Sequence, residues 1–213
     1  MKKIFIVRHG KTQWNQEGKI QGANGDPPLL NQSIKDAQDT GFYLKNFGID
    51  LIFASPLSRS LKTAELIAKS SGFKGTISLI EDLKEVGFGS WEGKLKDDLV
   101  ISHPTEFQLM KTRTDDNLLV NLGFETFEQA GNRFTNSVYN LANQLLENQN
   151  GLIVSHGAVI QLGLKKILNT NNIAGIKNTA VTSLSINDNQ ILLETFNEVG
   201  FLQDPANVKE IQF

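Results

Sequence analysis

Two short segments of the sequence, residues 3–7 and 151–154, are apolar at nearly every position. A strand with one face in water alternates apolar and polar residues, whereas a strand covered on both faces is apolar throughout. We therefore expect both segments to be central strands of a sheet that has helices on each side. Short β-branched runs indicate the remaining strands, at 51–54, 76–80, 183–186 and 191–196, with the last two joined as a hairpin through residues 187–190.

Helical patterns separate these strands. Between residues 31 and 47, apolar positions recur at intervals of three and four, which is the period of one helix face. Ser55 followed by Pro56 has the form of an N-cap with proline in the first helical position, and the pattern after it stops near Gly72. We expect one helix before and one helix after the strand at 51–54.

Two further helices are expected in the second half of the chain. Thr126 and Gln129 have the spacing of a capping box, and the apolar stripe that follows predicts a helix that ends at Asn150. A mostly apolar helix follows Gly157. Strands that alternate with helices favour an α/β fold. The pattern predicts a three-layer α/β/α sandwich around a mostly parallel, mixed sheet.

One segment does not fit this alternation. Residues 86–121 contain aromatics and short apolar clusters without a clear period, and we interpret them as an excursion over one end of the sheet that carries specificity. The sequence has no internal repeat and no low-complexity linker. We expect residues 1–213 to form a single domain with a lid at about 86–121.

The charge and residue counts exclude several classes of protein. The 21 Lys and Arg residues against 23 Asp and Glu residues give a formal net charge of −2, so no global positive field exists to hold a nucleic acid or an anionic membrane. The absence of cysteine excludes disulfides, thiolate nucleophiles and Cys-ligated metals. No apolar run is long enough for a signal peptide or a membrane span. We expect a cytoplasmic protein without a nucleic-acid or membrane partner.

Two of the three histidines occupy matching places in the sequence. His9 and His156 each follow an apolar strand by two residues, and a glycine follows each of them. The carboxyl ends of parallel strands line the ligand crevice in open α/β sheets. If the two strands are neighbours, both imidazoles lie in one pocket.

Two arginines suggest what this pocket binds. Arg8 precedes the first histidine, and Arg59 lies in the first turn of the helix after another strand end. A guanidinium offers forked donors that match phosphoryl oxygens, and a helix N-terminus adds free N–H groups. A basic residue in a first turn opposes the helix dipole, which favours a bound anion there. The combination indicates a phosphate site.

Four blocks of the sequence resemble the histidine phosphatase superfamily, in its phosphoglycerate-mutase-like branch. They are RHGKTQWN at 8–15, SPLSR at 55–59 followed by KTAE at 62–65, LKEVGFGSWEG at 83–93 and SHG at 155–157. The blocks occur in the order typical of the family and span most of the chain. The resemblance implies a phosphatase of small-molecule phosphate monoesters that needs no metal and no cofactor.

The resemblance also implies roles for individual residues. His9 would be the nucleophile that forms a phosphohistidine, and Arg8, Arg59 and His156 would surround the phosphoryl oxygens. Glu85 would be the general acid and base, near the apolar surfaces of Phe88 and Trp91 that would hold it protonated. Substrate contacts are implied for Thr12, Asn15, Gln21 and Gly22. Three neighbouring carboxylates also stay open as candidates for the acid: Glu81, Asp82 and Glu92.

Four residues depart from the family pattern or lie outside it. Phe124 stands where relatives often have glycine, so we expect it to narrow the mouth of the site, and Glu125 beside it becomes a possible substrate contact. Phe201 occupies a place where relatives often have histidine. His103 matches no motif and is interpreted as a surface residue.

The sequence leaves three further functions open. A cofactor-dependent phosphoglycerate mutase shares the transfer step, but the sequence lacks the Arg-Arg segment that such mutases carry after the acid. Between residues 94 and 116, four Lys and Arg face five Asp and Glu, a balance that does not favour a dense polyanion. A non-catalytic phosphate-binding protein is the second of these functions. A metal hydrolase that uses the two histidines is the third and the most remote.

Overall fold

The computed structural model describes residues 1–187 and 190–205, and the strands in these parts of the chain form one sheet in the order β3-β2-β4-β1-β5-β6. Neighbours among β1, β2, β3 and β4 pair in parallel, whereas β5 runs antiparallel to both β1 and β6. The predicted β5–β6 hairpin is present, although its turn residues 188–189 lie outside the described residues. The strands are β1 (Lys2–Arg8), β2 (Leu51–Ala54), β3 (Ile77–Leu79), β4 (Asn150–Ser155), β5 (Val181–Asn187) and β6 (Gln190–Glu198).

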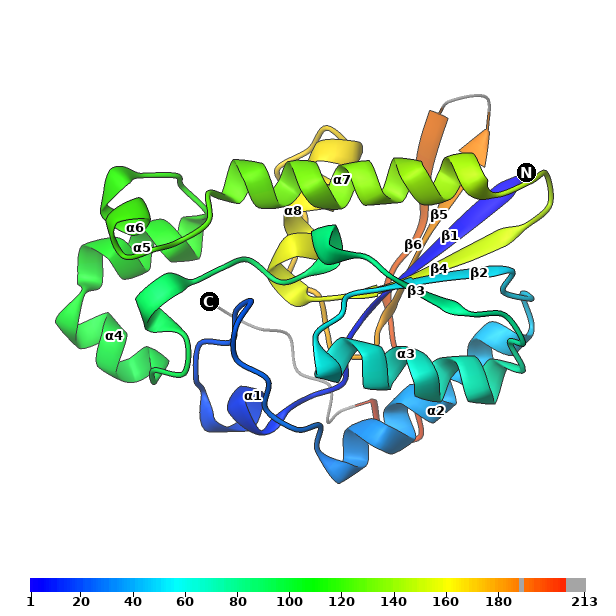
Figure 1. Ribbon diagram of the computed structural model, residues 1–213, viewed down its shortest axis with the longest axis horizontal. Helices are drawn as coiled ribbons and strands as arrows, with labels where there is room; N and C mark the ends of the chain where they lie inside the picture. Colours follow the sequence, from blue (N-terminus) through cyan, green and yellow to red (C-terminus); the bar gives the residue numbers. More distant parts are fainter. Residues whose placement is uncertain (188–189, 206–213) are drawn as a thin grey trace.

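Helices cover both faces of the sheet (Figure 1). On one face lie α2 (Asn31–Lys45) and α3 (Ser58–Ser71), which pack against each other. On the other lie α7 (Phe127–Gln144) and α8 (Gly157–Ile167), also packed together. Each layer buries its own apolar cluster against the sheet. The predicted three-layer α/β/α sandwich with a mostly parallel, mixed sheet is confirmed.

The two nearly apolar strands are neighbours at the centre of the sheet. β1 and β4 pair with Val7 opposite Val154 and Arg8 opposite Ser155. Ile4 in β1 and Leu152 in β4 are fully buried, as expected for strands covered on both faces. Because the register places the last residues of both strands opposite each other, the residues that follow leave the sheet at the same edge.

The start of α3 differs from the prediction. Ser55 does not cap the helix and Pro56 does not occupy its first turn, because α3 begins at Ser58, with Leu57 as an N-cap that makes no side-chain hydrogen bond. The Ser55 hydroxyl is instead bonded to His156. The two residues therefore form a short connection between β2 and α3, in which the serine binds His156 and does not cap the helix.

The predicted capping box of α7 is present, but the helix is shorter than expected. Thr126 and Gln129 exchange side-chain and backbone hydrogen bonds at its start. The helix ends at Gln144, and Asn150 is already the first residue of β4. The apolar stripe stops at Leu145, which caps the end of the helix, and residues 146–149 form the connection to the sheet.

The 86–121 segment lies beyond one end of the sheet (Figure 1). Its clusters without a clear period are short helices of one to three turns: α4 (Lys96–Ser102), α5 (Pro104–Thr112) and α6 (Asn117–Asn121). A helix this short shows too few repeats for its period to be read from the sequence. The remaining elements are α1 (Gln13–Glu17) and two 3-10 turns, η1 (Glu81–Leu83) and η2 (Gly89–Trp91).

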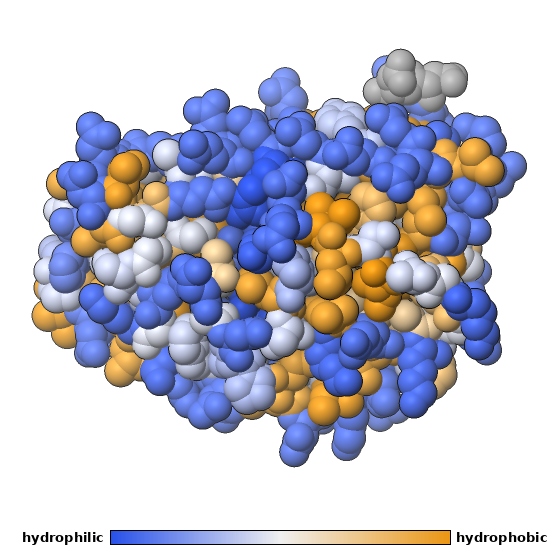
Figure 2. Space-filling model, in the orientation of Figure 1, coloured by the Kyte–Doolittle hydropathy of each residue, from blue (hydrophilic) through white to orange (hydrophobic). Residues whose placement is uncertain are grey.

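The surface is mainly hydrophilic, with some apolar areas. On the face drawn in Figure 2, hydrophobic residues gather between α7 and α3, where the β2–β3 side of the sheet is exposed. Leu79 of β3 is half exposed there. Among the described residues, no helix combines the length and the apolar character that crossing a membrane requires.

Candidate active site

The structure brings His9 and His156 together at the ends of β1 and β4. Their ring centroids lie 5.0 Å apart, with an angle of 57° between the ring planes. Both side chains are buried. The backbone of His9 is fixed from two sides, because its N–H donates to the carbonyl of Ser155 at 2.9 Å and its carbonyl accepts from Nδ2 of Asn178 at 2.8 Å.

The hydrogen bonds of His9 determine its tautomer. Nδ1 lies 2.7 Å from the carbonyl oxygen of Gly10, which can only accept, so Nδ1 carries the proton. The lone pair is then on Nε2. Burial, and next the positive charges of Arg59 and Arg8, lower the pKa of His9 well below its ordinary value. The imidazole is therefore neutral at neutral pH, with a nucleophilic nitrogen on the side away from Gly10.

His156 takes the opposite tautomer. Its Nδ1 accepts from Nε of Arg59 at 3.2 Å, so the proton is on Nε2, which donates to the hydroxyl of Ser55 at 2.8 Å. Burial, and then Arg59 and His9, lower its pKa well below the ordinary value. In this structure the N–H of His156 points at Ser55, so the imidazole orients Arg59 instead of offering a donor to an anion.

Arg59 reaches the histidines from the first turn of α3. Nη1 donates to the carbonyl of Gly25 at 2.6 Å and Nη2 to the carbonyl of Gly22 at 2.7 Å. Each of these nitrogens keeps a second N–H, because a guanidinium has five donors. Burial lowers the pKa of Arg59 to about 10, while Glu85 opposes the shift, so the group stays charged at neutral pH.

Arg8 is the second buried arginine of the site and occupies the last position of β1. Its Nη1 donates to the carbonyl of Ile176 at 2.6 Å, and its Nε lies beside Gly157, at the start of α8. That Nε is buried and has no hydrogen-bond partner among the described residues. Burial lowers the pKa of Arg8 to about 10, and Glu85 opposes this shift as well. The site therefore contains two buried cations beside two neutral imidazoles.

Glu92 holds the loop on which Arg59 depends. Its carboxylate accepts backbone N–H bonds from Ala23 at 3.1 Å, Asn24 at 2.8 Å and Gly25 at 3.2 Å, and one from Phe88 at 3.0 Å. The loop that it fixes supplies the carbonyls that orient Arg59. From the sequence, Glu92 was also a candidate for the general acid. In the structure, its carboxylate oxygens accept hydrogen bonds from backbone N–H groups.

The cavity beside His9 is small. Its volume is about 20 Å³, and its lining includes Arg8, Asn15, Gln21 and Lys96. Since about 10–15 Å³ on this measure holds one water molecule, a phosphoryl group requires the rim to open. Nε2 of Gln21 is buried there without a partner among the described residues. Together with Arg8 Nε, this gives the cavity two buried donors, which suit an anion.

The remaining predicted substrate residues have structural tasks. Thr12 caps α1, and its hydroxyl donates to Oε1 of Gln21 at 2.8 Å, which turns the Gln21 amide nitrogen toward the cavity. The side chain of Asn15 completes the capping box of α1 by accepting from Thr12 N–H. Gly22 contributes its carbonyl to Arg59, and a side chain at this position would collide with Glu92.

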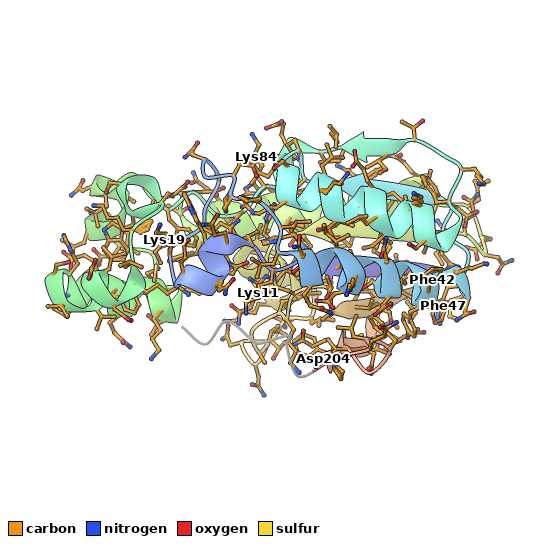
Figure 3. The ribbon with its side chains drawn as sticks, turned by 90° about the horizontal axis from the view of Figure 1, so that it is seen from below. Lys11, Lys19, Phe42, Phe47, Lys84 and Asp204 are labelled. Carbon is orange, nitrogen blue, oxygen red and sulfur yellow. The ribbon has the colours of Figure 1, made fainter. Side chains whose placement is uncertain are left out.

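Two lysines lie near the rim of the cavity, and neither was singled out in the sequence. Lys96 and Lys19 both line the cavity, and Figure 3 shows Lys19 on the side of α1 that faces the 86–121 segment. Burial, and then Arg8 and Arg113, lower the pKa of Lys96 to about 8. Acidic neighbours such as Asp97 are exposed. The balance of charges over residues 94–116 therefore does not describe the cavity, because a basic side chain faces inward while acidic ones face the solvent.

Glu85 lines the same cavity, but its surroundings differ from the prediction. Its Oε1 accepts from the N–H groups of Val86 at 3.0 Å and Val159 at 2.9 Å, and Oε2 accepts from Ala158 at 3.1 Å. Backbone donors at the start of α8 thus hold the carboxylate, rather than the apolar surfaces of two aromatics.

The two aromatic residues expected beside Glu85 differ in their positions. Phe88 does line the cavity, whereas Trp91 packs against Phe124 and other aromatic residues.

Near the mouth of the site, the prediction for Phe124 is wrong, and Glu125 has a partner within the protein. Phe124 does not narrow the mouth, because it is buried and packs edge-on against Phe88 and Trp91. Glu125 pairs with Arg133, with Oε1 at 2.7 Å from Nε and Oε2 at 2.8 Å from Nη2. This pair braces the chain on either side of Glu85, because Arg133 also donates to the carbonyls of Asp82, Lys84 and Glu85, and Glu125 accepts from Gly87 N–H.

Two aromatic rings outside the motifs also have packing roles. Phe201 stacks on Tyr43 of α2 at a centroid distance of 4.4 Å. His103 is partly exposed, and its ring packs edge-on against Trp91 at 5.7 Å. Within residues 1–187 and 190–205, no three His, Asp or Glu side chains are grouped so as to hold a metal ion.

Comparisons with known proteins agree with this geometry. Residues 4–199 match the histidine phosphatase superfamily (branch 1). The uncharacterized phosphatase PhoE of Bacillus subtilis (strain 168) is 34% identical over 167 residues, which cover 78% of each chain. The probable phosphoglycerate mutase GpmB of Salmonella paratyphi A is 28% identical, with 97% of each chain covered.

A solved structure of a phosphatase is also similar to this chain. A phosphoserine phosphatase variant from Entamoeba histolytica, in complex with phosphoserine, is 29% identical. The match covers 95% of this chain and 100% of that one, with a TM-score of 0.79. The chain therefore belongs to the histidine phosphatase superfamily, and it is a phosphatase with the fold of the phosphoglycerate mutase-like enzymes.

Proposed function

We propose that the protein hydrolyses small phosphate monoesters without a metal, through a phosphohistidine on His9. The observation that carries the proposal is the state of His9: a neutral imidazole whose Nε2 lone pair is unused and which lies among the buried guanidinium groups of Arg8 and Arg59. A cationic site attracts the dianionic phosphoryl group, while the neutral ring keeps its nucleophilicity.

The first step transfers the phosphoryl group from the substrate to the protein. Nε2 of His9 forms a bond to phosphorus while the bond from phosphorus to the ester oxygen breaks. The remaining N–H groups of Arg59 and Nε of Arg8 donate to the non-bridging oxygens, where negative charge is concentrated. His156 and the loop carbonyls keep Arg59 in place for this task, which makes His156 a positioning residue. Asn15 and Gln21, which line the same cavity, also contact the phosphoryl group.

Glu85 serves as the acid and then as the base. Its Oε2 accepts only one backbone N–H among the described contacts, so it retains a lone pair that can carry a proton. In the first step, this proton moves to the leaving alkoxide. In the second step, the carboxylate removes a proton from water, which attacks phosphorus and releases His9 and inorganic phosphate.

We place hydrolysis above mutase activity. Residues 86–121 act as the lid that selects the substrate, and a mutase requires this lid to exclude water from the phosphohistidine. Incubation with 3-phosphoglycerate distinguishes the two reactions, because a mutase yields 2-phosphoglycerate where hydrolysis yields inorganic phosphate. The similarity to a relative named as a probable mutase is the reason to include this substrate.

The test of the proposed function is the loss of turnover in His9→Ala. We expect kcat for p-nitrophenyl phosphate, measured with EDTA present, to fall by a factor on the order of 10⁴ or more, because no other side chain supplies the nucleophile. His103→Ala is the matched control, since this histidine lies outside the site, and it should keep the wild-type rate. Comparable rates in wild type and His9→Ala, or a wild-type protein inactivated by EDTA, would contradict the proposal.

The role of Glu85 predicts a dependence on the leaving group. In Glu85→Gln, hydrolysis of an alkyl phosphate such as glycerol phosphate should slow by about 10² or more, because its alkoxide must be protonated to leave. Hydrolysis of p-nitrophenyl phosphate should slow far less, since p-nitrophenolate leaves without a proton. Glu81→Gln, at an exposed carboxylate nearby, is the control. Equal losses for both substrates would place the acid elsewhere.

The neutral state of His9 has a direct spectroscopic signature. The chain has three histidines, so the Cε1–H region of the NMR spectrum contains three imidazole signals, and His9→Asn identifies one of them. We expect the His9 signal to keep its neutral chemical shift as the pH falls through 6.5. In Arg59→Gln, the midpoint should move to higher pH, because a repelling cation is lost. A wild-type midpoint at or above 6.5 would overturn this assignment.

A further inference from the structure

A second cavity, separate from the one beside His9, has a volume of about 520 Å³. It lies where the end of α5, the start of α7 and the C-terminal half of α8 meet (Figure 1). Small-molecule sites in proteins typically measure about 300–1,000 Å³, so this cavity has the size of a ligand site. Its lining contains none of the residues that the proposed reaction places at the phosphoryl group, although Thr112, Arg113 and Asp115 belong to the lid segment.

Three cations from two segments of the chain line this cavity. Arg113 follows α5, and Lys165 and Lys166 lie near the end of α8. The guanidinium of Arg113 is largely withdrawn from solvent: its Nε and Nη2 are buried, and its central carbon lies 5.5 Å from the centroid of the Phe127 ring. Its backbone is in the left-handed region, at φ 58°, because Arg113 caps the end of α5.

The two lysines add to the same positive field. Burial, and next the charge of Arg113, lower the pKa of Lys165, as expected for two cations at one cavity. Lys166 extends along α7, where Gly131 leaves room for it: a Cβ at that position would lie 2.9 Å from Cε of Lys166. Like charges gathered at one cavity create a potential that favours an anion between them.

The two carboxylates of the lining, Asp115 and Glu128, offset only part of the charge of its three cations. The carboxylate of Asp115 binds the start of α7: its Oδ1 accepts a hydrogen bond from Phe127 N–H at 2.6 Å, and its Oδ2 accepts one from Glu128 N–H at 3.0 Å. The side chain of Glu128 is exposed. Amide and hydroxyl groups complete the lining and can donate to anionic oxygens: they belong to Thr112, Asn169, Thr170 and Asn171.

We propose that this cavity binds a small anion with at least two negatively charged groups, carboxylates or phosphates, between Arg113, Lys165 and Lys166. The ligand bridges the end of α5 and the end of α8. Its charges face the two lysines at the open side and the buried guanidinium at the inner side.

Isothermal titration calorimetry on the full chain tests the proposal with two probes, citrate and inorganic pyrophosphate. Sodium chloride at 0.15 M suppresses diffuse attraction to surface charges. The double variant K165Q/K166Q removes two charges from the cavity. The double variant K62Q/K69Q removes the same number from exposed positions of α3, which covers the other face of the sheet from α7 and α8. Melting temperatures verify that both variants fold.

We expect saturable binding of at least one probe by the wild type. The affinity should fall at least tenfold in K165Q/K166Q and stay within twofold of the wild type in K62Q/K69Q. The probe that binds more tightly identifies carboxylates or phosphates as the recognised groups. Absence of saturable binding would overturn the proposal. So would equal affinities in the two double variants, because the anion would then occupy the site beside His9 or the general surface.

Discussion

The parallel pairing of β1 with β4 is the interaction on which the site depends. Its register sets Arg8 opposite Ser155, so that His9 and His156 leave the sheet side by side, with ring centroids 5.0 Å apart. Side chains alternate between the two faces of a strand, and a slip of one residue would therefore move Arg8 to the wrong face. Helices that cover both faces make such a slip costly, because it would expose or overpack two apolar cores. The stability of the sheet thus sets the geometry of the site.

Electrostatics give this geometry its chemical character. Arg8 and Arg59 are buried cations, and carbonyl oxygens such as that of Ile176 offset part of the cost of removing them from water. The carboxylate of Glu85 favours their charged state. The same two cations, together with burial, keep His9 neutral. A site that is cationic around a neutral nucleophile attracts a phosphoryl dianion and can also react with it, which neither feature alone would achieve.

The sequence predicted the sheet, the layers and the meeting of the two strand ends, because apolar periodicity and strand ends are local signals. It did not predict the partners of individual side chains. Ser55 has the form of a helix cap but binds His156, and Glu92 resembles a surface carboxylate but holds the loop beneath Arg59. In the sequence, the charge of Lys96 is balanced by neighbouring carboxylates, but in the fold its side chain lines the cavity beside His9. The partner of each of these side chains depends on contacts between segments that are distant in the sequence, and a local sequence pattern does not contain that information.

The central claim is that the phosphoryl group passes through a covalent bond to His9. Wild-type enzyme mixed with excess phosphate monoester, quenched within milliseconds into alkaline denaturant and digested, allows the labelled peptide to be found by mass spectrometry. The account predicts one added phosphoryl group on the peptide that contains His9, with fragmentation that places it on the imidazole. A phosphoryl group on another residue, or rapid turnover with an unmodified His9 at every quench time, would contradict it.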